Sequence, residues 1–243
     1  LSTDPDVRTS TLAQAFYRAQ QDARTAVRYL RKTRDEDGNP YGIGDKFAVG
    51  GDGTGGYMAL ALAALDKSEE VLLPKFMDTS DSTNIVPYIS EALYGNIEGT
   101  TATMLCNPNH VGYSSAIDMA FNFGGAMLDT LWMEAGEVPI ATFQNISDEF
   151  APYSVGVLTE PVNNDPVIEA MGGQLVIARA TALGNNDCFA DLSTTLNDVT
   201  YGFGNGAENA AIAGHADMPG LFPLRTPSSC LLYTSDAADD NAG

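Results

Sequence analysis

The stretch Lys46-Phe-Ala-Val-Gly-Gly-Asp-Gly-Thr-Gly-Gly-Tyr-Met-Ala-Leu-Ala-Leu-Ala-Ala-Leu65 decides the fold class. Residues 46–50 form a short apolar run that predicts a strand, and the glycines of residues 51–56 predict a tight bend. Residues 57–65 are almost all apolar, so they predict a helix that is buried on every side. A buried strand that leads directly into a buried helix is typical of a parallel sheet with helices packed on it.

Two further segments support this class. Apolar residues recur at helical spacing over Thr9–Arg34, which predicts an amphipathic helix that stops at Gly38 and Pro40. The run Glu137–Phe143 predicts a second buried strand, and it leads into a polar loop over residues 144–153. We therefore expect an α/β domain with a mostly parallel sheet flanked by helices.

The remaining assignments rest on weaker patterns. Residues 116–127 and 131–134 are rich in small and apolar residues and predict helical structure interrupted by glycine. Residues 166–183 place Ile168, Met171 and Leu175 on one face and predict another helix. Residues 192–217 are rich in glycine and asparagine, so we expect them to be irregular.

Composition excludes several classes of function. The 243 residues include 32 Asp and Glu against 12 Lys and Arg, which gives a formal charge of −20. Such a chain lacks the clustered cations that bind nucleic acid, and no apolar run approaches the length of a membrane helix. An acidic chain is compatible with a secreted or periplasmic protein. The sequence does not indicate the oligomeric state.

No cofactor or metal motif is present. Cys106 and Cys188 stand far apart without a CxxC pair or a nearby histidine cluster, so we expect no metal site. The two thiols could form a disulfide or remain free in the core. The bend at residues 51–56 matches neither G-x-G-x-x-G nor the P-loop pattern, which makes nucleotide binding a third-ranked interpretation.

Both ends of the chain look incomplete. Residues 230–240, Cys-Leu-Leu-Tyr-Thr-Ser-Asp-Ala-Ala-Asp-Asp, resemble a translated sequencing adapter, and the chain begins without Met. We therefore expect residues 1–229 to form one domain that is truncated at both ends. Residues 230–243 would be an artefactual tail that plays no part in the fold.

The bend has the parts of a nucleophile elbow. In the pattern G-x-S-x-G, a serine stands on a strained turn between a strand and a helix. Gly51 and Gly55 occupy the flanking positions, where we expect any Cβ atom to clash, and Gly56 extends the run. The central position is Gly53, so the hydroxyl of the nucleophile is missing. Asp52 completes the motif but cannot replace the serine without shifting the glycines.

The chain resembles the carboxylesterase and lipase branch of the α/β-hydrolase fold over residues 20–30, over residues 41–50 and at the bend. The similarity resumes over residues 138–153, where Ser-Asp-Glu-Phe-Ala-Pro-Tyr is similar to the loop that carries the catalytic acid. The resemblance implies a partial hydrolase fold that lacks the first strands and the loop with one oxyanion N–H. It also implies a small-molecule ester as substrate and ester hydrolysis as the reaction.

The resemblance further implies a triad in the order nucleophile, acid and histidine. Asp148 matches the acid, with Glu149 as a substitute, and His215 follows the acid whereas His110 precedes it. Thr54 would supply one backbone N–H of the oxyanion hole, and its hydroxyl could act as a displaced nucleophile.

Structural roles compete with each of these assignments. Asp148 could be an ordinary capping or loop aspartate, His215 could simply be exposed, and His110 could pack within its loop. A non-catalytic binding or structural protein on the same fold remains the alternative to an esterase.

Overall fold

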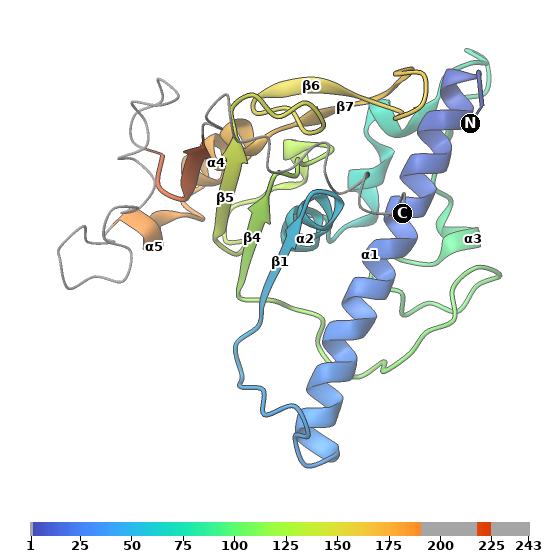
Figure 1. The fold of residues 1–243 in the computed structure, drawn as a ribbon. Helices are drawn as coiled ribbons and strands as arrows, with labels where there is room; N and C mark the ends of the chain where they lie inside the picture. Colours follow the sequence, from blue (N-terminus) through green and yellow to red (C-terminus); the bar gives the residue numbers. More distant parts are fainter. Residues whose placement is uncertain (1, 191–217, 225–243) are drawn as a thin grey trace, which may run out of the picture.

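The computed structural model describes residues 2–190 and 218–224. Its centre is a sheet of four parallel strands, which confirms the α/β class and the mostly parallel sheet (Figure 1). The strands follow one another in the order of the sequence: β1 (Ala48–Asp52), β4 (Met119–Phe123), β5 (Ile140–Asn145) and β8 (Leu221–Leu224). All four carboxyl ends therefore meet at one edge of the sheet, hereafter the carboxyl edge.

Two helices cover one face of this sheet. α2 (Thr54–Ala64) packs on β1 and β4, and α4 (Gly173–Ala182) packs on β5 and β8. α1 (Pro5–Glu36) lies outside α2 as a further layer (Figure 1). Asp4 caps α1 by accepting the backbone N–H groups of Asp6 and Val7, and Pro5 occupies the first turn, where its missing N–H costs nothing.

Shorter elements fill the connections. Within the described residues, two further sheets are two-stranded and antiparallel: β2 (Met77–Asp78) pairs with β3 (Val86–Pro87), and β6 (Val155–Thr159) pairs with β7 (Pro166–Met171). The β6–β7 sheet contacts α1 through β7. The remaining elements are η1 (Ser68–Leu72), η2 (Pro74–Phe76), α3 (Glu91–Tyr94), η3 (Thr130–Trp132) and α5 (Asp187–Ala190).

Four expected elements lie close to their observed positions. The helix expected over residues 57–65 is α2 (Thr54–Ala64). The helix expected over Thr9–Arg34 is α1, which extends a few residues further at each end. The two strands expected at residues 46–50 and 137–143 are β1 and β5, each displaced toward the C-terminus. Residues 192–217 and the tail at 230–243 lie outside the described residues.

The helix expected over residues 116–127 is wrong, because this segment contains β4. Ala120 and Asn122 are fully buried toward α2, whereas Phe121 and Phe123 point to the opposite face. This alternation has the period of two that defines a strand, but small residues on the buried side conceal it in the sequence. Residues 131–134 are likewise not an α-helix; only the short η3 forms there.

The single helix expected over residues 166–183 is also wrong. Its first part is β7, in which Ile168 and Ala170 alternate toward the core, and only its second part is α4. Gly172 separates the two elements. A Cβ atom there would lie 1.7 Å from the carbonyl oxygen of Pro152, so only glycine fits at this position.

None of the helices in residues 2–190 and 218–224 combines the length and the apolar character that a membrane crossing requires.

The packing of β1 on α2 predicts opposite effects at two neighbouring glycines. A Cβ atom at Gly51 would lie 2.1 Å from the carbonyl of Gly55, whereas a Cβ atom at Gly55 meets nothing within 4 Å. We expect Gly51→Ala to lower the free energy of unfolding by about 2 kcal/mol or more. Gly55→Ala should be neutral or stabilising by up to about 1 kcal/mol, because alanine favours the helix. Urea unfolding measures both, and equal losses would contradict the close approach.

Candidate active site

Gly53 turns the chain sharply between β1 and α2. Its dihedral angles are φ +53° and ψ −117°, a conformation that glycine reaches but that costs any other residue strain. The N–H of Gly53 donates to the carbonyl of Phe123 at 2.8 Å, at the end of β4. Its own carbonyl accepts the N–H groups of Gly56 and Tyr57 and so starts α2. The bend is therefore a strand–turn–helix corner fixed to the carboxyl edge.

The flanking glycines do not share one role. Gly51 must lack a side chain, as expected, because the backbone of Gly55 lies against it. The expectation that Gly55 itself has no room for a Cβ atom is wrong. Gly56 is the second crowded position, since a Cβ atom there would lie 2.1 Å from Oδ1 of Asn122 on β4.

Space is available where the nucleophile would stand. A Cβ atom built on Gly53 meets no atom within 4 Å, and the residue is half-buried. A small side chain at this position would therefore meet no steric obstacle, although the backbone would carry the strain of a positive φ.

Asp148 lies at the same edge of the sheet. It follows β5, and its Oδ1 accepts the N–H groups of Phe150 at 2.8 Å and Ala151 at 2.9 Å. Its Oδ2 lies 3.4 Å from a Cβ atom built on Gly124, the residue after the hydrogen-bond partner of Gly53. Asp148 and Gly53 thus both lie against the end of β4. Glu149, the substitute, is exposed beside it.

Thr54, whose backbone N–H is the predicted oxyanion donor, directly follows the bend. Thr54 is the first residue of α2, and N–H groups in the first turn have no partner within their helix. The helix dipole also places partial positive charge at this end. Asp52 ends β1 as an exposed residue directly before the bend.

The predicted base is not described. His215 lies outside the described residues. Pro219 and Gly220, which lead into β8, lie at the amino edge of the sheet, where the side-chain amide of Asn186 and the N–H of Thr142 donate to their carbonyls. That edge is opposite to the one that carries Asp148. His110 belongs to a loop against α1, with its ring 5.4 Å from that of Tyr29, which agrees with a packing role.

Sequence reasoning missed the side chains that fix the two loops of this site. Asn122 accepts the N–H of Gly125 at 2.8 Å and donates to its carbonyl at 3.0 Å, which shapes the turn after β4. Gln144 donates to the carbonyls of Ala151 and Pro152 and so fixes the loop that carries Asp148. Both side chains are fully buried. A polar residue at an inward position of a buried strand was the available signal.

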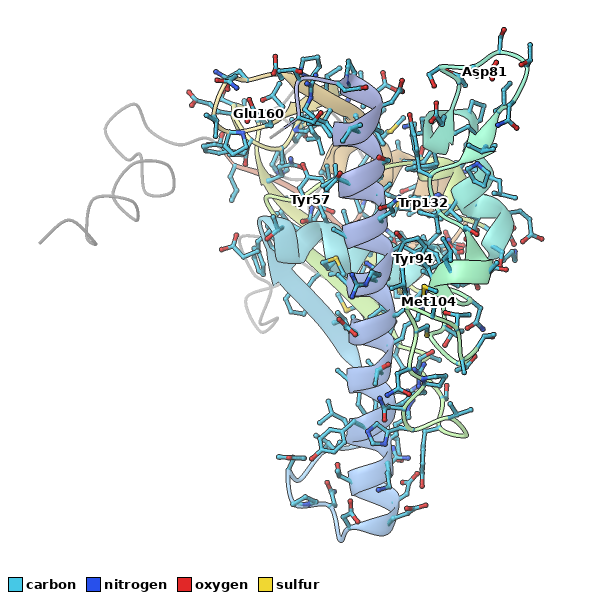
Figure 2. All side chains as sticks on the ribbon, turned by 90° about the vertical axis from the view of Figure 1, so that its right-hand side faces the viewer. Tyr57, Asp81, Tyr94, Met104, Trp132 and Glu160 are labelled. Atoms are coloured by element: carbon cyan, nitrogen blue, oxygen red, sulfur yellow. The ribbon has the colours of Figure 1, made fainter. Side chains whose placement is uncertain are left out.

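Tyr57 was also missed. Its hydroxyl is buried and makes no hydrogen bond to a described residue. Burial, reinforced by the negative charge of Asp148, raises the pKa of this phenol well above its usual value. The phenol therefore stays neutral beside the predicted acid. In Figure 2, Tyr57 lies to one side of α1 and Trp132 to the other.

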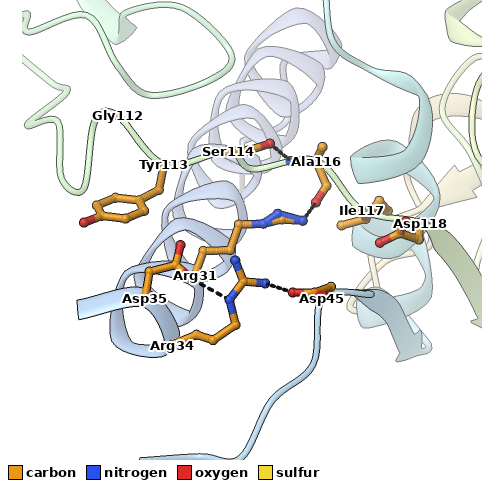
Figure 3. A pocket seen from close by; sticks show the side chains of 10 residues that line it. All are labelled: Arg31, Arg34, Asp35, Asp45, Gly112, Tyr113, Ser114, Ala116, Ile117 and Asp118. Carbon is orange, nitrogen blue, oxygen red and sulfur yellow. Dashed lines mark hydrogen bonds and ion pairs between the residues drawn. The ribbon is translucent and has the colours of Figure 1, made fainter. Parts of the chain in front are cut away.

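Two hollows in the described part of the chain lie away from the bend. The first, of about 430 Å³, lies at the amino edge (Figure 3). There Arg34 pairs with Asp35 and Asp45, and Arg31 donates to the carbonyl of Ala116. Its cations are thus already bound to neighbouring groups. The second, of about 300 Å³, lies between the start of α1 and the β2–β3 hairpin.

The described ranges contain neither a cluster of metal-ligand side chains nor a disulfide. Within residues 2–190 and 218–224, no group of three or more His, Cys, Asp or Glu side chains is arranged to hold a metal ion. Cys106 and Cys188 are both free; Cys106 is buried and Cys188 is exposed. The alternative of two buried free thiols therefore holds for Cys106 alone.

Comparison with known proteins gives no relative: no family model, no curated protein and no solved structure matches the chain.

The hydrogen bonds of Asp148 predict a structural role that is independent of any chemistry. Asp148→Ala removes the acceptor of two backbone N–H groups and should lower the free energy of unfolding by about 1 kcal/mol. Asp148→Asn keeps an oxygen acceptor and should cost less. Chemical denaturation measures both, with the exposed Glu149→Ala as the matched control. Equal losses at residues 148 and 149 would contradict the observed loop.

Proposed function

We propose that this chain has the scaffold of a serine ester hydrolase of the α/β-hydrolase type, with its nucleophile position left vacant by Gly53. One observation carries the proposal: the strained glycine bend between a parallel strand and a buried helix lies against the end of β4 at the carboxyl edge, and Asp148 lies against the next residue, Gly124. The sequential order of the four parallel strands agrees with it. This geometry is what a nucleophile elbow and its acid require.

The chemistry follows from the positions of these groups. A serine at position 53 would attack the ester carbonyl, pass its proton to a histidine and release the alcohol after that proton returns to the leaving oxygen. The N–H of Thr54 would donate to the oxyanion, and Asp148 would orient the imidazole, for which His215 is the predicted residue. Water would then hydrolyse the acyl-enzyme. Gly53 offers no hydroxyl, so the given chain cannot form this acyl-enzyme.

A displaced nucleophile is less well supported. Thr54 carries the nearest hydroxyl, but it belongs to the first turn of α2, one residue after the bend. A nucleophile must meet its base within hydrogen-bond distance, and the strained turn directs position 53 toward the open space. Position 53 thus remains the site of the proposed attack.

A non-catalytic binding or structural protein is the second candidate. The absence of a hydroxyl at Gly53 favours it. A shared fold does not by itself imply a shared reaction.

Restoring the hydroxyl separates the two candidates. We expect Gly53→Ser to hydrolyse p-nitrophenyl acetate roughly 100-fold or more faster than the given chain, the size of a general-base contribution. Gly53→Ala is the matched control, because it imposes the same backbone strain without a hydroxyl. Peptide mass spectrometry after treatment with a fluorophosphonate should find the adduct on residue 53. A folded Gly53→Ser protein with neither activity nor adduct would favour the binding protein.

The histidine assignment has its own test within the Gly53→Ser background. His215→Gln should abolish the gained activity, because the imidazole would be the base, whereas His110→Gln should leave it unchanged, because His110 packs against Tyr29. Esterase assays of the two double variants decide between them. Full activity in His215→Gln would reject His215 as the base while leaving position 53 as the nucleophile.

A further inference from the structure

The β6–β7 sheet has one edge that is bound to the rest of the fold. β7 forms this edge, and its last residue, Met171, exchanges two backbone hydrogen bonds of 2.8 Å with Met127. The carbonyl of Val167 accepts the hydroxyl of Thr9 on α1 at 2.6 Å. The outward side of β7 is therefore occupied by neighbouring segments.

The other edge, formed by β6, has no such neighbour. In the described part of the chain β6 pairs with β7 alone, and it lies at the periphery of the molecule, at the top of Figure 1. Gly172 donates to the carbonyl of Ser154, so Ser154 and every second residue after it bond toward β7. The backbone N–H and C=O groups of Val155 and Val157 therefore point outward, and no described residue binds them.

The side chains on this edge are apolar and exposed. Val155 and Val157 are 53% and 56% exposed, and they lie on the same face of the sheet because they are two residues apart. Edge strands usually carry a lysine, a proline or a bulge that prevents further pairing. β6 carries none of these: its sequence is Val-Gly-Val-Leu-Thr, and the register shift of the pair skips Val167 of β7 instead. β6 is thus a regular strand with one unused side.

A second copy of β6 complements this edge. An antiparallel pair with its twofold axis at Val157 places Val157 opposite its own copy and Val155 opposite Thr159. The outward N–H and C=O groups of both copies then bond to each other, and the exposed valines cover one another. The strand is therefore complementary to itself in hydrogen bonding and in side chains.

The charge on the chain does not oppose this pairing locally. Residues 151–159 contain no charged side chain, although the whole chain carries a formal charge of −20. The exposed Glu169 lies on β7 opposite Val157. Its copy would lie three strand spacings away, about 14 Å, which exceeds the screening length of roughly 8 Å at physiological salt. Like charges are thus kept apart at the pairing edge.

We propose that two copies of this chain associate through β6, which joins their β6–β7 sheets into one antiparallel sheet of four strands. Such a contact buries less surface than a permanent dimer, so the association is reversible, with a Kd on the order of 100 μM. A two-stranded sheet gains support when strands are added to it. This inference does not depend on the proposed esterase scaffold.

Sedimentation equilibrium of the full chain tests the dimer over roughly 10 μM to 1 mM, on both sides of the expected Kd. A reducing agent is needed, because the exposed Cys188 could cross-link two copies. Val157→Lys places like charges opposite each other and should weaken the dimer at least about 10-fold. Val162→Lys is the matched control, because it changes the charge equally at a 74% exposed valine outside the strand, and it should leave the dimer intact.

Val157→Pro tests the backbone contact separately. Proline removes the outward N–H of this residue but none of the hydrogen bonds to β7, so the dimer should be lost while the urea midpoint of the monomer stays close to that of the given chain.

Amide hydrogen exchange locates the interface. Exchange at Val155 and Val157 should slow in the given chain as its concentration rises, and should not change with concentration in Val157→Lys. A chain that stays monomeric throughout would leave this edge to a strand of another protein and overturn the inference. A dimer that persists unchanged in Val157→Lys, or one without slowed exchange at these amides, would also overturn it.

Discussion

The close approach of α2 to the parallel sheet is the constraint on which the rest of the structure depends. Gly51 lets β1 lie against the first turn of α2, and Gly56 lets the same turn lie against Asn122 of β4. A methyl group at Gly51 would meet the backbone of Gly55, and one at Gly56 would displace the buried side chain of Asn122. Because the helix starts at Gly53 and stays close, the bend stands at the carboxyl edge and its amide hydrogen reaches the end of β4.

This contact sets the positions of the groups in the candidate site. β4 ends between the bend and the loop after β5, since Gly53 donates to Phe123 and Asp148 lies against Gly124. The buried side-chain amide of Asn122 fixes the turn after β4, and that of Gln144 fixes the loop that carries Asp148, through hydrogen bonds to their backbones. Such amides satisfy loop backbone groups that would otherwise be buried without partners. The scaffold is thus well formed around a position that carries no reactive group.

Much of this could be predicted from the sequence. The glycine-rich bend, the long amphipathic α1 and the apolar run of β5 have periodicities and turn residues that act locally, so their types were correctly assigned. β4 and β7 were mistaken for helices, because small residues such as Ala120 and Ala170 pack in strands and helices alike. The roles of Asn122 and Gln144 were missed, since a buried amide has meaning only when the loop it binds is known.

What the sequence by itself determined is the class of fold, the place of the bend and the absence of a hydroxyl at its centre. These are properties of backbone freedom and residue chemistry, which act within a few positions of the chain. Only the tertiary structure decided that Asp148 lies against Gly124 at the end of β4, that Gly55 has space while Gly51 has none, and that Asn122 and Gln144 are buried. Each of these depends on which distant segments meet, because burial and electrostatic interaction act through space rather than along the chain.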